Sequence, residues 1–165
     1  MIKMVRVDER LVHGQVAVSW SKVLGITHLV VINDRVAKNE MQKMTLKMAV
    51  PENIKFLVKG VEEGIALLND PRIENFTLMV VIENFTDAFE IVKRVPGIEI
   101  LNVGNYGLLP VNQRGNEQKE IASAVRVDAE DLSIIKMIAE LNIPFEAQLT
   151  PDAPKKNMKK IMKGA

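Results

Sequence analysis

One short segment of the chain gathers the side chains that could carry out chemistry. It reads Arg6-Val7-Asp8-Glu9-Arg10-Leu11-Val12-His13-Gly14-Gln15, and so contains two arginines, two acidic residues and a histidine. A neutral imidazole is a good nitrogen nucleophile towards phosphorus, and arginine binds phosphoryl oxygens through paired N–H donors. An isolated loop histidine more often has only a surface or capping role. The neighbouring arginines are the reason to favour phosphoryl transfer on His13.

The neighbours of this histidine each have an expected part in that chemistry. We expect Arg10 and Arg6 to contact phosphoryl oxygens, and Asp8 to orient the imidazole or to hold an arginine in place. Gly14 allows a close approach of the backbone. The N–H groups at the start of the first helix, around Gly14 and Gln15, should point towards a bound anion. Because these groups neutralise the phosphoryl charge, no metal and no cofactor is expected.

The elements that must position this segment follow an α/β pattern, in which short β-branched runs alternate with stretches of helical period. Strands are predicted at residues 2–7, 29–32, 54–58, 78–82, 98–103, 121–127 and 144–149. Helices are predicted at residues 14–24, 38–48, 61–68, 87–95, 130–141 and 154–163. We therefore expect one domain over residues 1–165, with a single open, mostly parallel twisted sheet of about six to seven strands and helices on both faces. Such sheets bind ligands beyond the carboxyl ends of their strands, where residues 8–14 would lie.

Several residues outside the segment have predicted structural roles. Thr86 and Asp128 are expected to cap the helices that follow them. Met41, Met44 and Met48 recur at helical spacing, which predicts a face packed against the core.

Three further features have more than one interpretation. Trp20 is expected in the core rather than at a ligand site. His28 has no arginine cluster beside it, which favours a structural or surface role. Asn33-Asp34 ends the second predicted strand, where it either lines the site or only starts a turn.

The composition excludes several other classes of function. The 165 residues include 22 basic and 21 acidic ones, a formal charge of +1, and this balance argues against nucleic acid as a partner. No stretch approaches the roughly 18 apolar residues of a membrane helix, and the first residues do not resemble a signal peptide, so we expect a cytoplasmic protein. With 0 Cys and 2 His, disulfides, thiolate chemistry and a nitrogen-rich metal site are not expected.

The segment from Asp8 to Val16 resembles a family signature. It matches D-x-R-L-[IV]-H-G-Q-V of the EIIB component of mannose/fructose/sorbose-type sugar phosphotransferase systems (PTS), and the resemblance continues at residues 102–104, 124–128 and 148–152. Asn105 departs from the family glycine, and residues 108–120 match poorly.

The resemblance implies a function for the whole chain, that of a protein-N(pi)-phosphohistidine–sugar phosphotransferase. His13 would accept a phosphoryl group from a phosphohistidine of the EIIA component and pass it to a sugar entering through the membrane components EIIC and EIID. Arg10 and Asp8 match the family arginine and aspartate. The protein would then associate peripherally with the membrane transporter. Other EIIB families use a cysteine nucleophile, which this chain lacks.

Two other functions are weighed beside this one. A receiver-like signalling domain could use Asp8-Glu9 as an acidic metal pocket, but it needs a phospho-accepting aspartate after the third strand, where the chain has Val58-Lys59-Gly60. A non-catalytic α/β regulatory module would need no covalent chemistry. The sequence does not indicate which sugar is transported, and a homodimer through the methionines or the basic C-terminal helix is compatible with it.

Overall fold

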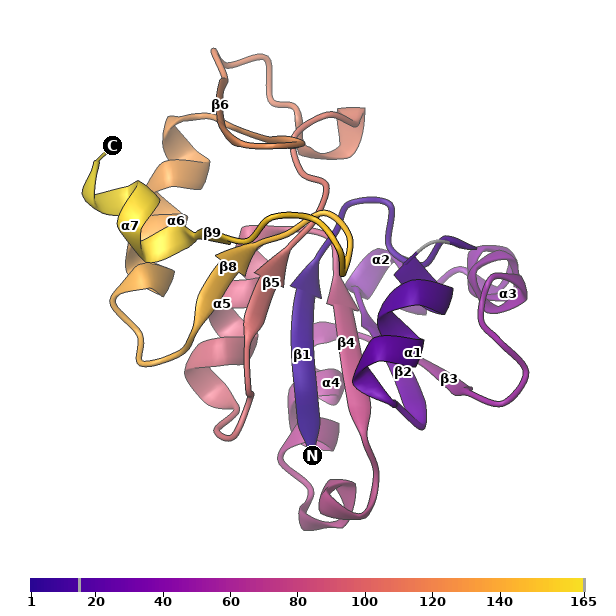
Figure 1. Ribbon diagram of the computed structural model, residues 1–165. Helices are drawn as coiled ribbons and strands as arrows, with labels where there is room; N and C mark the ends of the chain where they lie inside the picture. The colour runs from indigo at the N-terminus through magenta and orange to yellow at the C-terminus, as the bar shows by residue number, and fades with distance from the viewer. Residues whose placement is uncertain (15, 165) are drawn as a thin grey trace.

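The computed structural model describes residues 1–14 and 16–164, and its centre is a seven-stranded sheet (Figure 1). The strand order is β3-β2-β4-β1-β5-β8-β9, and all neighbouring strands are parallel except β8 and β9. The strands are β1 (Ile2–Val7), β2 (His28–Ile32), β3 (Lys55–Lys59), β4 (Leu78–Ile82), β5 (Leu101–Val103), β8 (Phe145–Ala147) and β9 (Lys156–Asn157). The predicted open, mostly parallel sheet is confirmed.

Helices cover both faces of this sheet, as predicted. One core lies between the sheet and α4 (Val61–Leu68), α5 (Phe85–Arg94), α6 (Ala129–Ala139) and α7 (Met158–Lys163). The second core lies under the π-helix η1 (Val16–Trp20), which continues into α1 (Ser21–Leu24), and under α2 (Asp34–Ala37) and α3 (Glu40–Met48). Two 3-10 helices, η2 (Pro71–Asn75) and η3 (Pro110–Asn112), lie in connections. Side chains of a strand alternate between the two cores, Val30 and Ile32 in one and Leu29 and Val31 in the other.

The connections leave two central strands towards opposite faces. After β1 the chain enters η1 and α1 on one face, whereas after β4 it enters α5 on the other. Since β1 and β4 are paired neighbours, their carboxyl ends form a topological switch point, the place where open α/β sheets bind ligands. The loop from Asp8 to Gly14 begins there (Figure 1).

The prediction that the methionines of α3 pack against the core is wrong. The helix expected at 38–48 is present as α3 but begins at Glu40, because the side chain of Asn39 caps it by accepting from the backbone N–H of Gln42 at 3.0 Å. The helix buries only Leu46, whereas Met41, Met44 and Met48 are exposed. The cause is its position beside the edge strand β3, where there is little sheet for a helix to cover.

Other boundaries also differ from the prediction. The cap of α5 is Asn84, not Thr86, because the Asn84 side chain accepts from the backbone N–H of Asp87 at 2.8 Å. Residues 121–127 are not one strand but part of a hairpin, β6 (Lys119–Ala122) and β7 (Val125–Val127), which forms a separate two-stranded sheet. The chain reverses at Ala124, which has φ +61°. The Asp128 cap of α6 is confirmed, as a capping box with Asp131.

Candidate functional site

The loop after β1 is held in one tight shape. The backbone N–H of Asp8 donates to Ile82 at the end of β4 (2.9 Å), and the N–H of Leu11 donates back to the carbonyl of Asp8 (2.9 Å). Leu11 has φ +58° and is buried. A left-handed conformation at a residue other than glycine costs about 1–2 kcal/mol, and such strain occurs most often at functional sites. The buried Leu11 side chain thus fastens a strained turn just before His13.

The carboxylate of Asp8 is the centre of the cluster. Its Oδ1 accepts from the backbone N–H of Arg10 (3.1 Å) and from Arg10 Nε (3.0 Å), and its Oδ2 accepts from Arg10 Nη2 (2.9 Å) and Arg6 Nη2 (3.3 Å). Oδ2 also lies 3.9 Å from Nε2 of His13. The structure therefore brings together the four charged or titratable residues that the sequence singled out.

Electrostatics keep this carboxylate ionised. Burial by itself raises the pKa of the Asp8 carboxyl, but the nearby His13 imidazole and the guanidinium groups of Arg10 and Arg6 outweigh burial and hold that pKa well below its usual range. The cluster thus contains a fixed negative charge beneath the imidazole.

Arg6 lies in the interior beneath the loop, not at its surface. Its Nη1 donates to the Asn102 side chain and to the carbonyl of Gln148 (2.9 Å), and its Nη2 donates to the carbonyl of Leu149 (2.8 Å). Its guanidinium carbon is 5.0 Å from the centroid of the Trp20 ring, and Trp20 is buried as predicted. The predicted contact of Arg6 with phosphoryl oxygens does not agree with this placement, because the guanidinium is enclosed and bonded to protein acceptors.

Burial also weakens the affinity of Arg6 for its proton. It lowers the pKa of the guanidinium to about 10, against the opposing influence of the Asp8 carboxylate. Arg6 is still charged at neutral pH. It therefore joins β1 to β5 and to the loop after β8, and at the same time balances the charge of Asp8.

The exposed part of this loop contains Arg10, His13 and Gly14. The Arg10 side chain is 35% exposed and that of His13 is 27% exposed. The carbonyl of His13 accepts from the backbone N–H of Ala17 (2.9 Å), so His13 lies at the start of the first helical segment, as predicted. Gly14 is exposed, and a Cβ added there would meet nothing within 4 Å. Gln15 lies outside the described residues.

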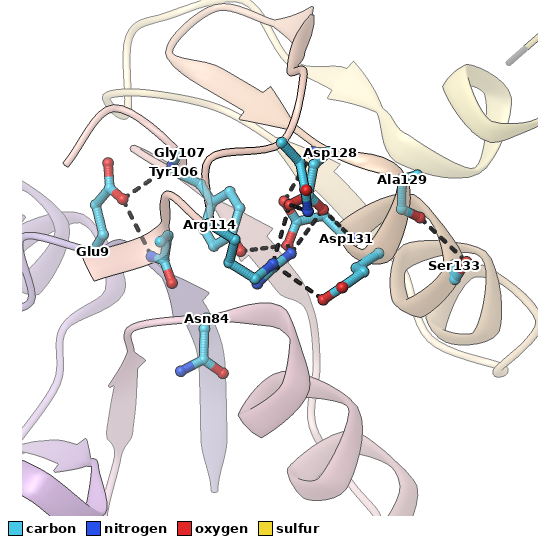
Figure 2. A network of polar contacts seen from close by, with 12 residues as sticks. Glu9, Asn84, Tyr106, Gly107, Arg114, Asp128, Ala129, Asp131 and Ser133 are labelled. Atoms are coloured by element: carbon cyan, nitrogen blue, oxygen red, sulfur yellow. Dashed lines mark hydrogen bonds and ion pairs between the residues drawn. The ribbon is translucent and has the colours of Figure 1, made fainter. Parts of the chain in front are cut away.

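Glu9 lies beside the site and binds a distant loop, a part that the sequence did not reveal. Its buried carboxylate accepts from the backbone N–H groups of Gly107 (3.0 Å), Leu108 (2.9 Å) and Leu109 (3.1 Å), as Figure 2 shows in part. The side-chain amides of Asn105 (2.7 Å) and Asn112 (3.2 Å) donate to it as well. These partners are 96 to 103 residues away in the chain, so no local sequence motif could predict them.

A second polar network fastens the far end of that loop to α6 (Figure 2). Arg114 donates from Nε to Asp128 (3.0 Å) and from Nη2 to Asp128 and Asp131 (both 2.7 Å), and the Tyr106 hydroxyl donates to Asp131 (2.6 Å). The hydrogen bonds that Arg114 donates to Asp128 are the first cause of the raised pKa of Arg114. The poorly matching segment 108–120 is therefore bonded to Glu9 near its start and to the N-terminus of α6 further along.

The other predicted candidates have local roles. Asn33 caps α2 by accepting from the N–H of Val36 (3.0 Å), and Asp34 accepts from the N–H of Val61 at the start of α4 (2.8 Å). The ring of His28 lies against that of Phe76, with 4.7 Å between their centroids, in agreement with a structural or surface role. Among the residues that the structure describes, no group of three or more His, Cys, Asp or Glu could hold a metal ion.

The fold and this geometry define an α/β domain that presents a histidine, a buried aspartate and a half-exposed arginine at the switch point of its sheet. Comparison with known proteins identifies the family to which this domain belongs. Residues 2–165 match the family described as PTS system sorbose subfamily IIB component, and the chain belongs to that family.

Individual relatives agree with this assignment. The chain is 43% identical over 141 residues to a probable phosphotransferase enzyme IIB component of Streptococcus pyogenes serotype M6, and the match covers 86% of each protein. It is 29% identical over 158 residues to the mannose-specific EIIAB component of Escherichia coli K12, covering 96% of this chain and 47% of that one. The crystal structure of the IIBSor domain of the sorbose permease from Klebsiella pneumoniae matches with a TM-score of 0.87 and 25% identity, over 100% of this chain and 98% of that one.

None of the helices among residues 1–14 and 16–164 combines the length and apolar character that crossing a membrane requires.

Proposed function

We propose that this EIIB component is a phosphocarrier that accepts a phosphoryl group on His13 from a phosphohistidine of EIIA. It then transfers the group, at the cytoplasmic side of the membrane, to a sugar entering through EIIC and EIID. The observation that carries the proposal is the half-exposed imidazole of His13 above the ionised Asp8 carboxylate, at the switch point of the sheet. The E. coli relative, named as a joined EIIAB component, supports EIIA as the donor.

The geometry favours one ring nitrogen as the nucleophile. Nε2 of His13 is buried and faces Asp8 Oδ2 at 3.9 Å. A proton on Nε2 is stabilised by that carboxylate, which leaves the lone pair on Nδ1, the pi nitrogen, for attack. The Nδ1–P bond forms as the N–P bond of the donor histidine breaks, and the donor nitrogen recovers its lone pair. In the second step the sugar 6-hydroxyl attacks phosphorus, its proton leaves to a base, and Nδ1 is released.

Arg10 is the side chain that we assign to the phosphoryl oxygens. Its Nε and Nη2 bind Asp8, while a third of the side chain is open to solvent. The guanidinium has five N–H donors, so some are free for the phosphoryl group. The backbone at Gly14 is proposed to approach the same oxygens, and the phosphate contact of Gln15 stays a prediction from the sequence. Arg6 acts from beneath, by holding Asp8.

The test uses the two histidines of the chain as a matched pair. The protein is incubated with phosphoenolpyruvate, the general phosphotransferase proteins and its EIIA, and label on the protein is measured. His28→Ala, which alters the histidine without an arginine cluster, should be labelled like the wild type, whereas His13→Ala should take up none. The label should survive alkali and be lost in acid. Full labelling of His13→Ala would show that the nucleophile is another residue.

The same assay separates the other functions. Label that is lost in alkali would indicate an aspartyl phosphate, as in a receiver domain. No label from any EIIA would indicate a regulatory module without covalent chemistry. In the structure β3 ends at Lys59 and Gly60, not an aspartate, follows it, so we expect neither outcome.

A further inference from the structure

The carboxylate of Glu9 has an unusual set of partners for a buried charge. All five of its donors are neutral amide N–H groups, three from consecutive backbone positions and two from asparagine side chains. Hydrogen bonds to a charged acceptor are roughly twice as strong as those between neutral groups. Every one of these donors belongs to residues 105–112, so the side chain of Glu9 is bonded to that loop at five positions.

The held loop lies at the same edge of the sheet as His13. It follows β5, which is paired in parallel with β1, and the backbone N–H of Glu9 itself donates to the carbonyl of Asn105 (2.9 Å). Because the amides of Leu108 and Leu109 turn inward to Glu9, their side chains are displayed outward. Leu108 is 43%, Leu109 38% and Val111 48% exposed.

We propose that Glu9 is a positioning residue that holds Leu108, Leu109 and Val111 as a recognition edge for the phosphoryl-donor protein. This inference rests on the proposed function of His13. Three neighbouring apolar side chains suit the centre of a protein interface, which is depleted of charge, and do not suit a sugar rich in hydroxyl groups. A donor that must dissociate in every cycle needs only a small interface, below about 1,200 Å², and in such an interface a few residues supply most of the affinity.

The test compares two phosphoryl donors on the same variants. Phospho-EIIA must dock on the protein, whereas phosphoramidate, a small N–P donor, need only reach His13. Glu9→Gln keeps the size of the side chain but replaces one acceptor oxygen by a donor that opposes the loop amides. We expect the KM for phospho-EIIA to rise about tenfold, equivalent to about 1.4 kcal/mol, with kcat within twofold and the phosphoramidate rate unchanged. Glu9→Asp, which keeps the charge, should give an intermediate KM.

The edge itself is tested by surface variants. Leu108→Ser combined with Val111→Ser removes two exposed apolar side chains and leaves the Glu9 contacts to the backbone in place, so it should raise the same KM. Met41→Ser, at a methionine that is 79% exposed on α3, is the control and should leave the KM unchanged. Urea midpoints of all variants show whether the fold is kept.

Each other outcome overturns the inference in a recognisable way. If Glu9→Gln slows phosphoramidate as much as phospho-EIIA, Glu9 acts on the His13 loop and not on docking. If the KM for phospho-EIIA is unchanged and only transfer to sugar in membrane vesicles falls, the edge faces the membrane partner. If wild-type protein is labelled by neither donor, the proposed function itself is wrong, whereas labelled wild type with an unaffected Glu9→Gln refutes only the role of Glu9.

Discussion

Replacing Asp8 by asparagine should destabilise the fold strongly, because it leaves a buried cation without its counter-charge. The side chains of Asp8 and Arg6 are both fully buried, 3.3 Å apart. Removing one partner of a buried ion pair costs about 3–5 kcal/mol. Asparagine keeps one acceptor oxygen, and the pair with the half-exposed Arg10 adds little, so we expect about 3 kcal/mol. For a chain of this length that corresponds to a fall in Tm of about 6–12 °C.

The stability that the Asp8 carboxylate contributes depends on pH. The Asp8 pKa is depressed in the folded protein, whereas in the unfolded chain it is about 3.9. Below that pH the carboxylate is protonated in the unfolded chain but still ionised in the folded chain. The stability due to the carboxylate is therefore present above about pH 4 and is lost as the pH falls towards the pKa of the folded state. The difference in unfolding free energy between wild type and Asp8→Asn should therefore shrink from pH 5 to pH 3.

Urea unfolding followed by circular dichroism at pH 7, 5, 4 and 3 measures this difference directly. Asp70→Asn is the matched control: Arg72 lowers the pKa of Asp70 to about 2, but the pair is exposed, so its loss should hardly move the urea midpoint. An Asp8→Asn protein as stable as the wild type at pH 7, or one with an unchanged acid slope, would refute the view that Asp8 balances buried Arg6.

Four further substitutions test the surroundings of the site. Burial, together with nearby acidic groups, raises the pKa of Asp87 to about 6. The contribution of Asp87 to wild-type stability should therefore fall by about 1–2 kcal/mol as the pH rises from 4 to 6. Asp87→Asn should abolish that fall in urea titrations. Asp128→Ala removes the cap of α6 and should lower the unfolding free energy by about 1–2 kcal/mol. A Cβ at Gly104 would lie 2.1 Å from Arg6 Nη2, whereas one at Gly14 meets nothing within 4 Å. Gly104→Ala should therefore cost more than about 3 kcal/mol, and Gly14→Ala should keep its Tm but slow phosphoryl uptake.

The sheet could be predicted from the sequence because its central strands are buried on both faces. Runs such as Leu78–Ile82 are continuous apolar stretches, which little else in a chain of this size produces. The cap of α5 and the exposure of the methionines on α3 could not be predicted in this way. Asn84 and Thr86 are both good capping residues, and only the point where the chain leaves β4 decides between them. Met41 has a helical spacing that suits a core, but exposure depends on how much sheet lies beneath the helix.

The site was predictable where its residues are local and not where they depend on distant partners. Arg10 and His13 lie in one loop, so their common position follows from the chain itself. Arg6 looks the same in sequence, yet β1 carries it into the interior, where Asn102 and Gln148 accept its hydrogen bonds. Phosphate binding and internal ion pairing use the same guanidinium chemistry, so residue type alone could not separate them.

The two adjacent carboxylates explain why one short loop can serve both reactivity and recognition. Asp8 turns to two guanidinium groups and the imidazole, whereas Glu9 turns only to neutral amides of the loop after β5. Consecutive residues leaving a strand point to opposite sides, so the chain cannot direct one carboxylate to His13 without offering the next one to the neighbouring loop. A shift of the loop by one residue would place Glu9 against buried Arg6 and would bring Arg10, not a carboxylate, to the amides. The strained turn at Leu11 fixes this register, and through it couples the charge beneath the nucleophile to the surface that a donor would meet.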